Sequence, residues 1–370
     1  MSDARDPAPA APAGPEARGG ADFLLYGSYG YTGRLIARRA VDAGLRPLLA
    51  GRDRDQVAAH AAELGLQHRA FALDDRAALD AALGEVPVVL HSAGPFAHTA
   101  APMAEACLRT GTHYLDITGE IAVFEAMAAL GERARAAGVM LLPGAGFDVV
   151  PSDCLAAHLK RRLPSAVRLR LAFRALGGGL SRGTATTMVE NVQRGGAVRR
   201  GGRITPVPAA WKARTVDFGR GPVSVTTIPW GDVSTAYHST GIPDIEVYTR
   251  VPASQRRLMV ASRRLGWLLG SGPVQRFLKG RIRKGKPGPT EAERASGGSL
   301  LWGEVEDAEA RRAVSRMRTP EGYTLTAMTS VEIVRKVLAG QAPPGFQTPS
   351  LAYGPDWVLE LEGVEREDVE

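Results

Sequence analysis

Three glycines, Gly27, Gly30 and Gly33, recur every third residue near the start of the chain. Glycine lets backbone N–H groups approach an anion closely, and the first turn of a helix adds partial positive charge. In such a turn the first glycine permits the bend, the second admits a diphosphate and the third lets the helix pack on the strand. We therefore expect a dinucleotide to contact the whole segment, which is Gly27-Ser28-Tyr29-Gly30-Tyr31-Thr32-Gly33.

The glycine spacing, GxxGxxG, places the first glycine one position earlier than in the commonest dinucleotide fingerprint. The alternative is an ordinary strand-to-helix turn that uses glycines only for geometry. The flanking residues favour the dinucleotide site. An unbroken apolar run, Phe23–Tyr26, precedes the turn, as is typical of a buried parallel strand, and Leu35, Ile36, Ala40 and Val41 follow at helical spacing.

Gly51 and Arg52 end the second apolar run of the chain. Sites that prefer NAD usually carry an acidic residue here, because it binds the ribose hydroxyls. A guanidinium instead binds a 2′-phosphate through paired, charge-assisted hydrogen bonds. Arg52, with Arg54 as a second contributor, therefore predicts NADP(H). The alternative is that Arg52 only ends an exposed strand while Asp53 begins the next helix.

Glu120 and Asp148 are carboxylates that we expect to follow two later strands of the same sheet. Ligands of such sheets bind beyond the carboxyl ends of the strands. A reduction needs a proton donor, and burial can tune a carboxylic acid for that task. The two residues are our candidate catalytic groups, although either could instead cap a helix or loop.

Other polar residues near these strand ends are weaker candidates. His91 and His113 are expected to be core histidines with satisfied hydrogen bonds, and Asp153 an N-terminal helix residue. Tyr237 and His238 are expected on a strand of a second domain.

The segment after the fourth strand contains small residues that would let the backbone pass close to a cofactor. We expect four residues of this segment to contact the cofactor: Ala93, Gly94, Pro95 and Phe96.

Apolar strands alternate with alanine-rich helices from residue 21 to about residue 143. This alternation predicts an α/β fold with a doubly wound parallel sheet, the Rossmann arrangement. After Pro151 the strands alternate apolar and polar residues, which predicts a second α+β domain on a mixed or antiparallel sheet. Within it, the segment from Gly285 to Gly298 is expected to be a polar, mobile loop. The expected divisions are a disordered tail (1–20), the NADP-binding domain (21–150), a substrate-binding domain (151–345) and a C-terminal segment that packs back on the Rossmann domain (346–370).

The composition is that of a globular chain, with 370 residues of which 44% are hydrophobic. The alanine-, proline- and glycine-rich first residues lack the apolar stretch of a secretory signal, and no run is apolar enough to span a bilayer. Cys107 and Cys154 lie in apolar helical surroundings, so we expect core residues and neither a disulfide nor a metal site. A cytoplasmic protein is expected.

Ten positive charges and no acidic residue occur between residues 256 and 286, whereas the whole chain has a net charge of +7. The charge is therefore local, and with neither interleaved aromatic residues nor a known motif it does not predict nucleic-acid binding. Leu258, Leu265, Trp267, Leu268 and Leu269 form an apolar stripe beside these arginines. Such a segment could bind an anionic membrane surface or an acidic partner, or simply pack its apolar face on the core.

The motifs together resemble the saccharopine dehydrogenase-like oxidoreductases, in the branch that includes trans-acting enoyl reductases. The resemblance rests on the glycine turn, residues 50–53, 93–96 and 114–120, Gly146-Phe147-Asp148 with Pro151-Ser152-Asp153, and residues 322–327 and 345–349. It implies reduction of an apolar enoyl, acyl or ketone substrate, alone or carrier-bound, by hydride transfer from NADPH in lipid or polyketide-type metabolism. The alternatives are a non-catalytic NADP-binding protein and a membrane-peripheral protein that acts through residues 256–286.

Overall fold

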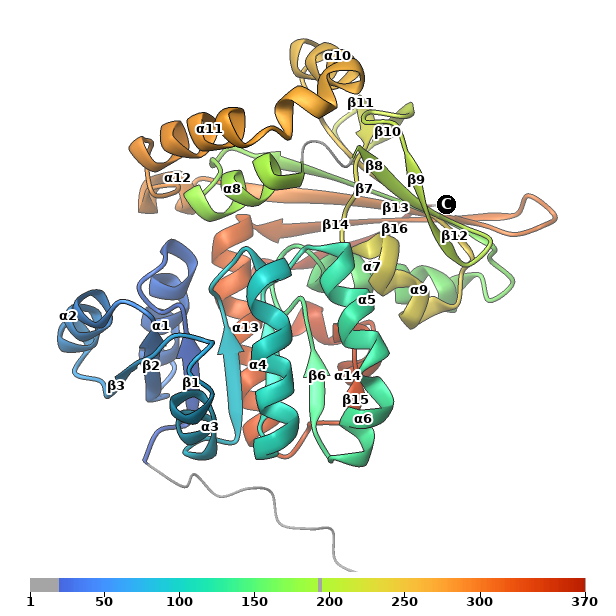
Figure 1. Cartoon of the computed structure of the whole chain (residues 1–370). Helices are drawn as coiled ribbons and strands as arrows, with labels where there is room; N and C mark the ends of the chain where they lie inside the picture. The colour runs from blue at the N-terminus through green and yellow to red at the C-terminus, as the bar shows by residue number, and fades with distance from the viewer. Residues whose placement is uncertain (1–19, 192–194, 370) are drawn as a thin grey trace, which may run out of the picture.

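The computed structural model describes residues 20–191 and 195–369, without the side chains of residues 265–268. Two sheets organise the described residues, one above the other in Figure 1. The expected tail falls almost wholly on residues 1–19, which lie outside the described residues.

The first sheet has seven strands in the order β15-β6-β5-β4-β1-β2-β3, and each recorded strand pair is parallel. Its strands are β1 (Phe23–Tyr26), β2 (Pro47–Gly51), β3 (His68–Ala70), β4 (Val88–His91), β5 (His113–Asp116), β6 (Met140–Leu142) and β15 (Gly345–Phe346). All four residues of β1 are buried, as expected of a strand covered on both faces. The strand order reverses between β1 and β4, which lie side by side.

Helices cover both faces of this sheet. They are α1 (Tyr31–Asp42), α2 (Arg54–Leu64), α3 (Arg76–Gly84), α4 (Phe96–Thr110), α5 (Ile121–Ala129), α6 (Gly131–Ala136) and α13 (Gly322–Leu338). Phe23 and Leu25 of β1 share a core with α1 and α13, whereas Leu24 and Tyr26 share a core with α3 and α4. The predicted doubly wound fold is therefore confirmed.

The second sheet is mixed, with the main strand order β10-β11-β12-β7-β13-β14-β16; β8 also pairs with β12, and β9 pairs with β8. Its strands are β7 (Arg168–Leu176), β8 (Gly196–Arg200), β9 (Arg203–Val207), β10 (Ala213–Asp217), β11 (Pro222–Thr227), β12 (Asp244–Thr249), β13 (Gly298–Glu306), β14 (Arg312–Pro320) and β16 (Glu365–Val369). β12 and β7 are parallel, whereas β7, β13 and β14 are antiparallel neighbours. The expected second mixed-sheet domain is confirmed.

Two groups of helices flank the second sheet (Figure 1). On the side of the first sheet lie α7 (Val150–Arg162) and α9 (Asp232–Thr240). On the opposite side lie α8 (Arg182–Asn191), α10 (Ala253–Leu269), α11 (Gly272–Lys284) and α12 (Glu291–Ala295). α7 packs on β13, where the Cβ of any larger residue at Gly303 would approach Leu155 and Leu159.

The two domains are not divided in the chain as expected. α13, inside the proposed residues 151–345, packs on α1, and β15 pairs with β6. The proposed C-terminal segment 346–370 is shared: Phe346 lies in the first sheet, whereas β16 pairs with β14 in the second. Between them come α14 (Pro349–Tyr353) and the short 3-10 helix η2 (Trp357–Glu360). Local sequence patterns could not predict that the chain goes back to the first sheet and then to the second, because these crossings depend on pairing between strands far apart in the chain.

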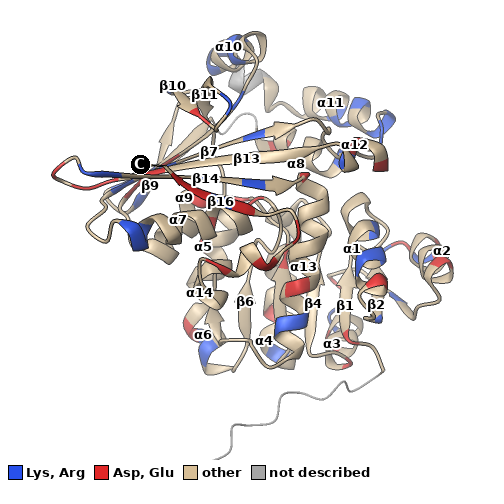
Figure 2. Ribbon diagram, turned by 180° about the vertical axis from the view of Figure 1, so that it is seen from behind, with Lys and Arg blue, Asp and Glu red and all other residues tan. Residues whose placement is uncertain are grey.

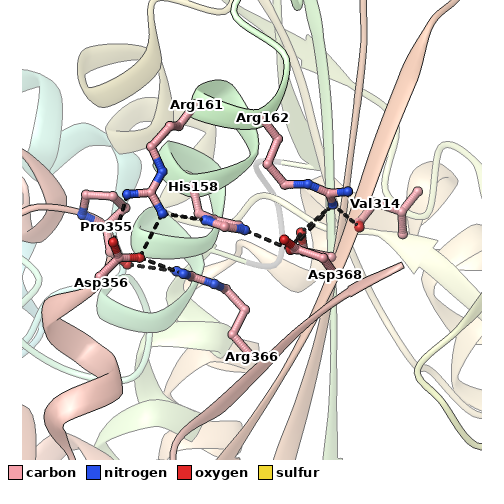
Figure 3. A network of polar contacts seen from close by, with 9 residues as sticks. His158, Arg161, Arg162, Val314, Pro355, Asp356, Arg366 and Asp368 are labelled. Carbon is pink, nitrogen blue, oxygen red and sulfur yellow. Dashed lines mark hydrogen bonds and ion pairs between the residues drawn. The ribbon is translucent and has the colours of Figure 1, made fainter. Parts of the chain in front are cut away.

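A polar network fixes the C-terminal segment to α7 (Figure 3). Arg161 and Arg366 bind Asp356 with N–O distances of 2.7 and 2.6 Å. His158 Nε2 lies 2.8 Å from Asp368 Oδ1. The network therefore joins η2 and β16 to the helix that packs between the two sheets.

Two local expectations were wrong. Tyr237 and His238 were expected on a strand but lie on α9, whose burial follows from its packing on α7 and β12. The segment from Gly285 to Gly298 was expected to be a polar, mobile loop, but it contains α12. Thr290 and Glu293 begin that helix with a reciprocal capping box.

Candidate cofactor and substrate site

The glycine turn lies at the carboxyl end of β1, at the point where the strand order of the first sheet reverses. Doubly wound sheets bind ligands at such a point. Gly27 has a φ of +85°, and a Cβ there would lie 2.8 Å from the backbone nitrogen of Ala93. The turn after β1 and the loop after β4 are therefore in direct backbone contact, which only glycine permits.

The backbone N–H groups at the start of α1 have no side-chain cap. Gly30 is the N-cap of α1 and provides no side-chain hydrogen bond to the first turn. At Gly33 a Cβ would overlap the carbonyl oxygen of Gly27, so a larger residue there would displace the turn. Ser28 Oγ is buried without a hydrogen-bond partner among the described residues. Uncapped N–H groups, a free hydroxyl and a glycine-lined approach together fit the diphosphate of a dinucleotide.

Arg52 is exposed directly after β2 and forms no ion pair within the described residues. Gly51 lies against the ring of Tyr29, where a Cβ would come within 2.5 Å of Cε1. Asp53 caps α2 and accepts a hydrogen bond from Gln56 N at 3.1 Å. The nearest carboxylate along the chain therefore has a structural partner, whereas the guanidinium is free to bind a phosphate.

Glu120 lies against the loop that follows β4. Its carboxylate accepts hydrogen bonds from Phe96 N at 2.8 Å and from Ala97 N at 3.1 Å, and thereby caps α4. Thr99 Oγ1 donates to Ala93 O at 2.8 Å and closes the same loop. Glu120 thus makes the capping contacts that the sequence left open, and it holds the predicted segment 93–96 beside the glycine turn.

Asp148 has different surroundings. Its carboxyl group is half-buried and makes no hydrogen bond or ion pair within the described residues. A Cβ at Gly119 would lie 2.6 Å from Asp148 Oδ2, so the carboxyl group packs against the backbone of the loop after β5. Burial raises the pKa of Asp148 to about 7. Asp148 therefore combines access with a proton that it can hold near neutral pH.

An aromatic cluster that the sequence analysis did not assign to the site lies next to Asp148. The rings of Phe147 and Phe173 are 6.1 Å apart, and Phe173 lies 4.5 Å from Trp230. All three side chains are only partly buried. They come from three distant segments, so no local pattern groups them; only the position of Phe147 beside Asp148 was a signal. The cluster gives this part of the molecule an apolar surface.

The side chain of Tyr31 points away from the backbone of the glycine turn, toward residues that lie far along the chain. Its hydroxyl donates to Pro289 O at 2.6 Å and accepts a hydrogen bond from Arg294 at 3.0 Å. Its ring packs edge-on against Tyr323, with 5.1 Å between centroids. The segment 285–297, which includes α12, therefore covers the first turn of α1, and it belongs to the candidate site although it was expected to be a mobile loop.

Residues 23–142 match the profile of the saccharopine dehydrogenase NADP binding domain. The match covers about a third of the chain and confirms the predicted resemblance over the first domain.

Proteins named trans-acting enoyl reductase are similar to part of this saccharopine dehydrogenase-like chain. The Mycobacterium leprae protein is 34% identical over 150 residues, which cover 38% of this chain and 36% of that protein. The Mycobacterium tuberculosis H37Rv protein is 31% identical over 149 residues, again 38% of this chain and 36% of that protein. The chain thus spans little more than a third of the length of these relatives.

The likeness to one solved structure extends over both domains of this chain. Apo saccharopine dehydrogenase (L-Glu forming) from Saccharomyces cerevisiae superposes with a TM-score of 0.64 over 95% of this chain and 100% of that chain. The sequence identity is 14%, so this likeness shows the saccharopine dehydrogenase fold alone.

The remaining candidate residues have structural contacts. His113 Nδ1 accepts a hydrogen bond from Met140 N, and Asp153 is buried where it accepts from Ser239 and Ser350. His91 is buried as expected, but both ring nitrogens lack a hydrogen-bond partner among the described residues, so the expected satisfaction was wrong. Burial lowers the pKa of His91 to about 3, which keeps the ring neutral.

Tyr237 and His238 on α9 also have contacts of their own. The guanidinium of Arg199 stacks on Tyr237 at 4.2 Å, and His238 Nε2 lies 3.8 Å from Glu125 Oε1. Cys107 and Cys154 are buried and free. Within the described ranges, no cluster of histidine, cysteine and acidic residues could hold a metal ion.

The basic residues 256–286 form α10 and α11 on the outer side of the second sheet, where Figure 2 shows many blue segments. Leu258 and Phe277 are 71% and 63% exposed. Leu265, Trp267 and Leu268 of the expected apolar stripe lie outside the described side chains. No helix in the described part of the chain is long and apolar enough to cross a bilayer.

Proposed function

We propose that the chain is an NADP(H)-dependent oxidoreductase that reduces an apolar enoyl, acyl or ketone substrate. The observation that carries this proposal is Asp148, a half-buried carboxyl group without a partner in the described residues, beside the loop that follows β5. The names of the mycobacterial relatives support the choice of an enoyl substrate.

The cofactor site would use residues from three strand ends. The backbone of Gly30 and the first turn of α1 would bind the diphosphate, and Arg52 the 2′-phosphate. The loop 93–96, held by Glu120, would pass beside the nicotinamide. When bound, NADPH supplies a hydride.

Asp148 would supply the proton that completes the reduction. The substrate gains a hydride at one atom of its double bond, and Asp148 donates its carboxyl proton to the other atom, which carries the developing negative charge. Water then returns a proton to the Asp148 carboxylate. Phe147, Phe173 and Trp230 would bind the apolar part of the substrate and exclude water from the same region.

The test is NADPH consumption by the purified protein with a panel of enoyl thioesters and ketones of increasing chain length. We expect NADPH oxidation together with a product that mass spectrometry finds heavier by two hydrogens, and faster turnover of longer apolar chains. NADPH binding without oxidation across the panel would contradict catalysis and support the non-catalytic alternative.

We propose a peripheral membrane contact through α10 and α11 as a second function. Exposed Leu258 and Phe277 lie among arginines that form no ion pair within the described residues, and this favours an anionic lipid surface. Co-sedimentation with vesicles of phosphatidylglycerol, lost when Leu258 and Phe277 are both replaced by serine, would support the contact. Equal sedimentation with neutral phosphatidylcholine vesicles, or none with either lipid, would contradict it.

A further inference from the structure

A cavity lies at one end of the second sheet, beside the segment 285–297 that contacts Tyr31. Its volume is about 950 Å³, and five arginines line it: Arg174, Arg220, Arg250, Arg294 and Arg318. A neighbouring hollow of about 370 Å³ shares Arg174 and Arg250 with it. We call the larger cavity the arginine pocket.

The strands fix two of these arginines on one face. Arg174 of β7 and Arg318 of β14 both lie in register with Leu300 of β13, which separates them. Partners in register point to the same side of a sheet, and two strand spacings put the two Cα atoms roughly 10 Å apart. Figure 2 shows blue segments on β7 and β14 toward the ends that lie beside α12. Two guanidinium groups can therefore reach a single ligand between them.

The charge of the arginine pocket is not neutralised within the described residues. None of the five arginines forms an ion pair there, and only Arg294 uses its side chain in hydrogen bonds, to Tyr31 and Pro289. Two acidic residues line the pocket. Glu321 caps α13, accepting from Tyr323 N and Thr324 N at 2.9 and 3.0 Å. Glu365 is exposed and lies opposite Arg318 in the β14–β16 register, without an ion pair among the described residues.

Arginines elsewhere on the same sheet are paired. Arg170 lies 2.6 Å and Arg214 3.3 Å from Glu304, and Arg316 lies 3.1 Å from Asp217. Other arginines of this sheet therefore have carboxylate partners, unlike the five that line the pocket. The concentration of guanidinium groups without an ion pair in the described residues is therefore a local feature of this cavity.

We propose that the arginine pocket binds a small molecule that carries two or more phosphate groups. Guanidinium groups bind phosphate oxygens in pairs, and several of them around one cavity match a ligand with several negative charges. The cavity has the size of ordinary ligand sites. This site goes beyond the proposed oxidoreductase function. The pocket borders the candidate cofactor site, because Arg294 of the segment 285–297 lines it and bonds Tyr31, but Gly30, Arg52 and the loop 93–96 do not line it.

The test is calorimetric titration of the full chain with inorganic pyrophosphate at physiological ionic strength. We expect binding by the wild type and a loss of at least about tenfold in affinity when Arg174→Gln and Arg318→Gln are combined. The control combines Arg281→Gln and Arg283→Gln, which remove the same charge from α11, and should bind like the wild type. Unchanged thermal unfolding of the test variant without ligand shows that it is folded.

Four outcomes would contradict the proposal. The first is no binding by the wild type, and the second is equal weakening in both double variants, which indicates only diffuse charge. The third is binding that survives in the Arg174/Arg318 variant and competes with NADPH, because the anion then occupies the glycine turn. Equally tight binding of citrate would contradict a phosphate ligand.

Discussion

At the level of single residues, hydrogen bonds distinguish the roles of two carboxylates that were equal candidates for the catalytic group in the sequence. Glu120 and Asp148 both follow strands of the first sheet, and either could have capped a helix. Glu120 accepts two backbone hydrogen bonds and caps α4, whereas Asp148 accepts none in the described residues. The spacing of residues along the chain could not distinguish them, because Phe96 and Ala97 lie more than 20 residues before Glu120.

Asp148→Asn is expected to lower kcat/KM by about 100-fold, since it removes a general acid, with NADPH affinity unchanged. The wild-type kcat/KM should be constant below pH 7 and fall above it, because the pKa of Asp148 is raised to about 7 and only the protonated form donates. Steady-state kinetics of both proteins, over about two pH units on each side of neutrality, measure the loss in the variant and the pH profile of the wild type.

Glu120→Gln is the matched control, because Glu120 is not the proposed proton donor. The amide oxygen keeps one of the two backbone hydrogen bonds at α4, so cofactor affinity should fall modestly while the pH profile stays that of the wild type. The assignment of Asp148 fails if the Glu120 variant loses the rate and the Asp148 variant retains it.

At the scale of elements, strands and helices of the first domain followed from apolar patterns, but the cover over its glycine turn did not. The residues around Gly285 are rich in lysine, proline and glycine, which predicted a loop. Tertiary contacts order it: Tyr31 of α1 bonds Pro289, and the ring of Tyr31 fills the space beside Gly288. The residues around this segment could not predict the contact, because Tyr31 lies 258 residues before Pro289 in the chain.

Tyr31→Phe should loosen residues 285–297, because the Pro289 and Arg294 contacts of the hydroxyl are lost while the ring remains. One net hydrogen bond is worth about 1 kcal/mol, so local opening should increase about fivefold. Amide hydrogen exchange of this segment measures the change. Tyr29→Phe is the control, because the Tyr29 hydroxyl has no hydrogen-bond partner among the described residues. Equal exchange in the two variants would show that the Tyr31 hydroxyl does not hold residues 285–297 in place.

At the scale of the whole molecule, the chain crosses between its two sheets more than once. α13 and β15 return to the first sheet, and β16 then joins the second. The mixed sheet could be predicted from alternating strands, whereas the position of its last strand could not, because Glu365–Val369 is mostly polar and pairs with β14 at its edge. The network around Asp356 fixes this return (Figure 3).

Asp356→Asn should lower the thermal unfolding midpoint by about 1–2 °C at neutral pH, since partly exposed ion pairs are worth at most about 1 kcal/mol. Hydrogen bonds from Arg161 and Arg366 hold the pKa of Asp356 well below its usual value. The stabilisation is therefore complete above the unfolded-state pKa of about 4 and is lost as the pH falls toward the folded-state pKa.

The difference between wild type and Asp356→Asn should accordingly shrink as thermal scans are moved from neutral pH to below about pH 4. A difference that stays constant through this range would show that the ionised carboxylate contributes nothing to stability.

The central claim is that the glycine turn and Arg52 bind NADPH. Its most direct test is calorimetric titration of the wild type, Arg52→Asp and the exposed control Arg203→Asp with NADPH and NADH. We predict that the wild type and control bind NADPH at least about tenfold more tightly than NADH, and that Arg52→Asp loses this preference. Failure of the wild type to bind either nucleotide, or equal affinity for both, would contradict the claim.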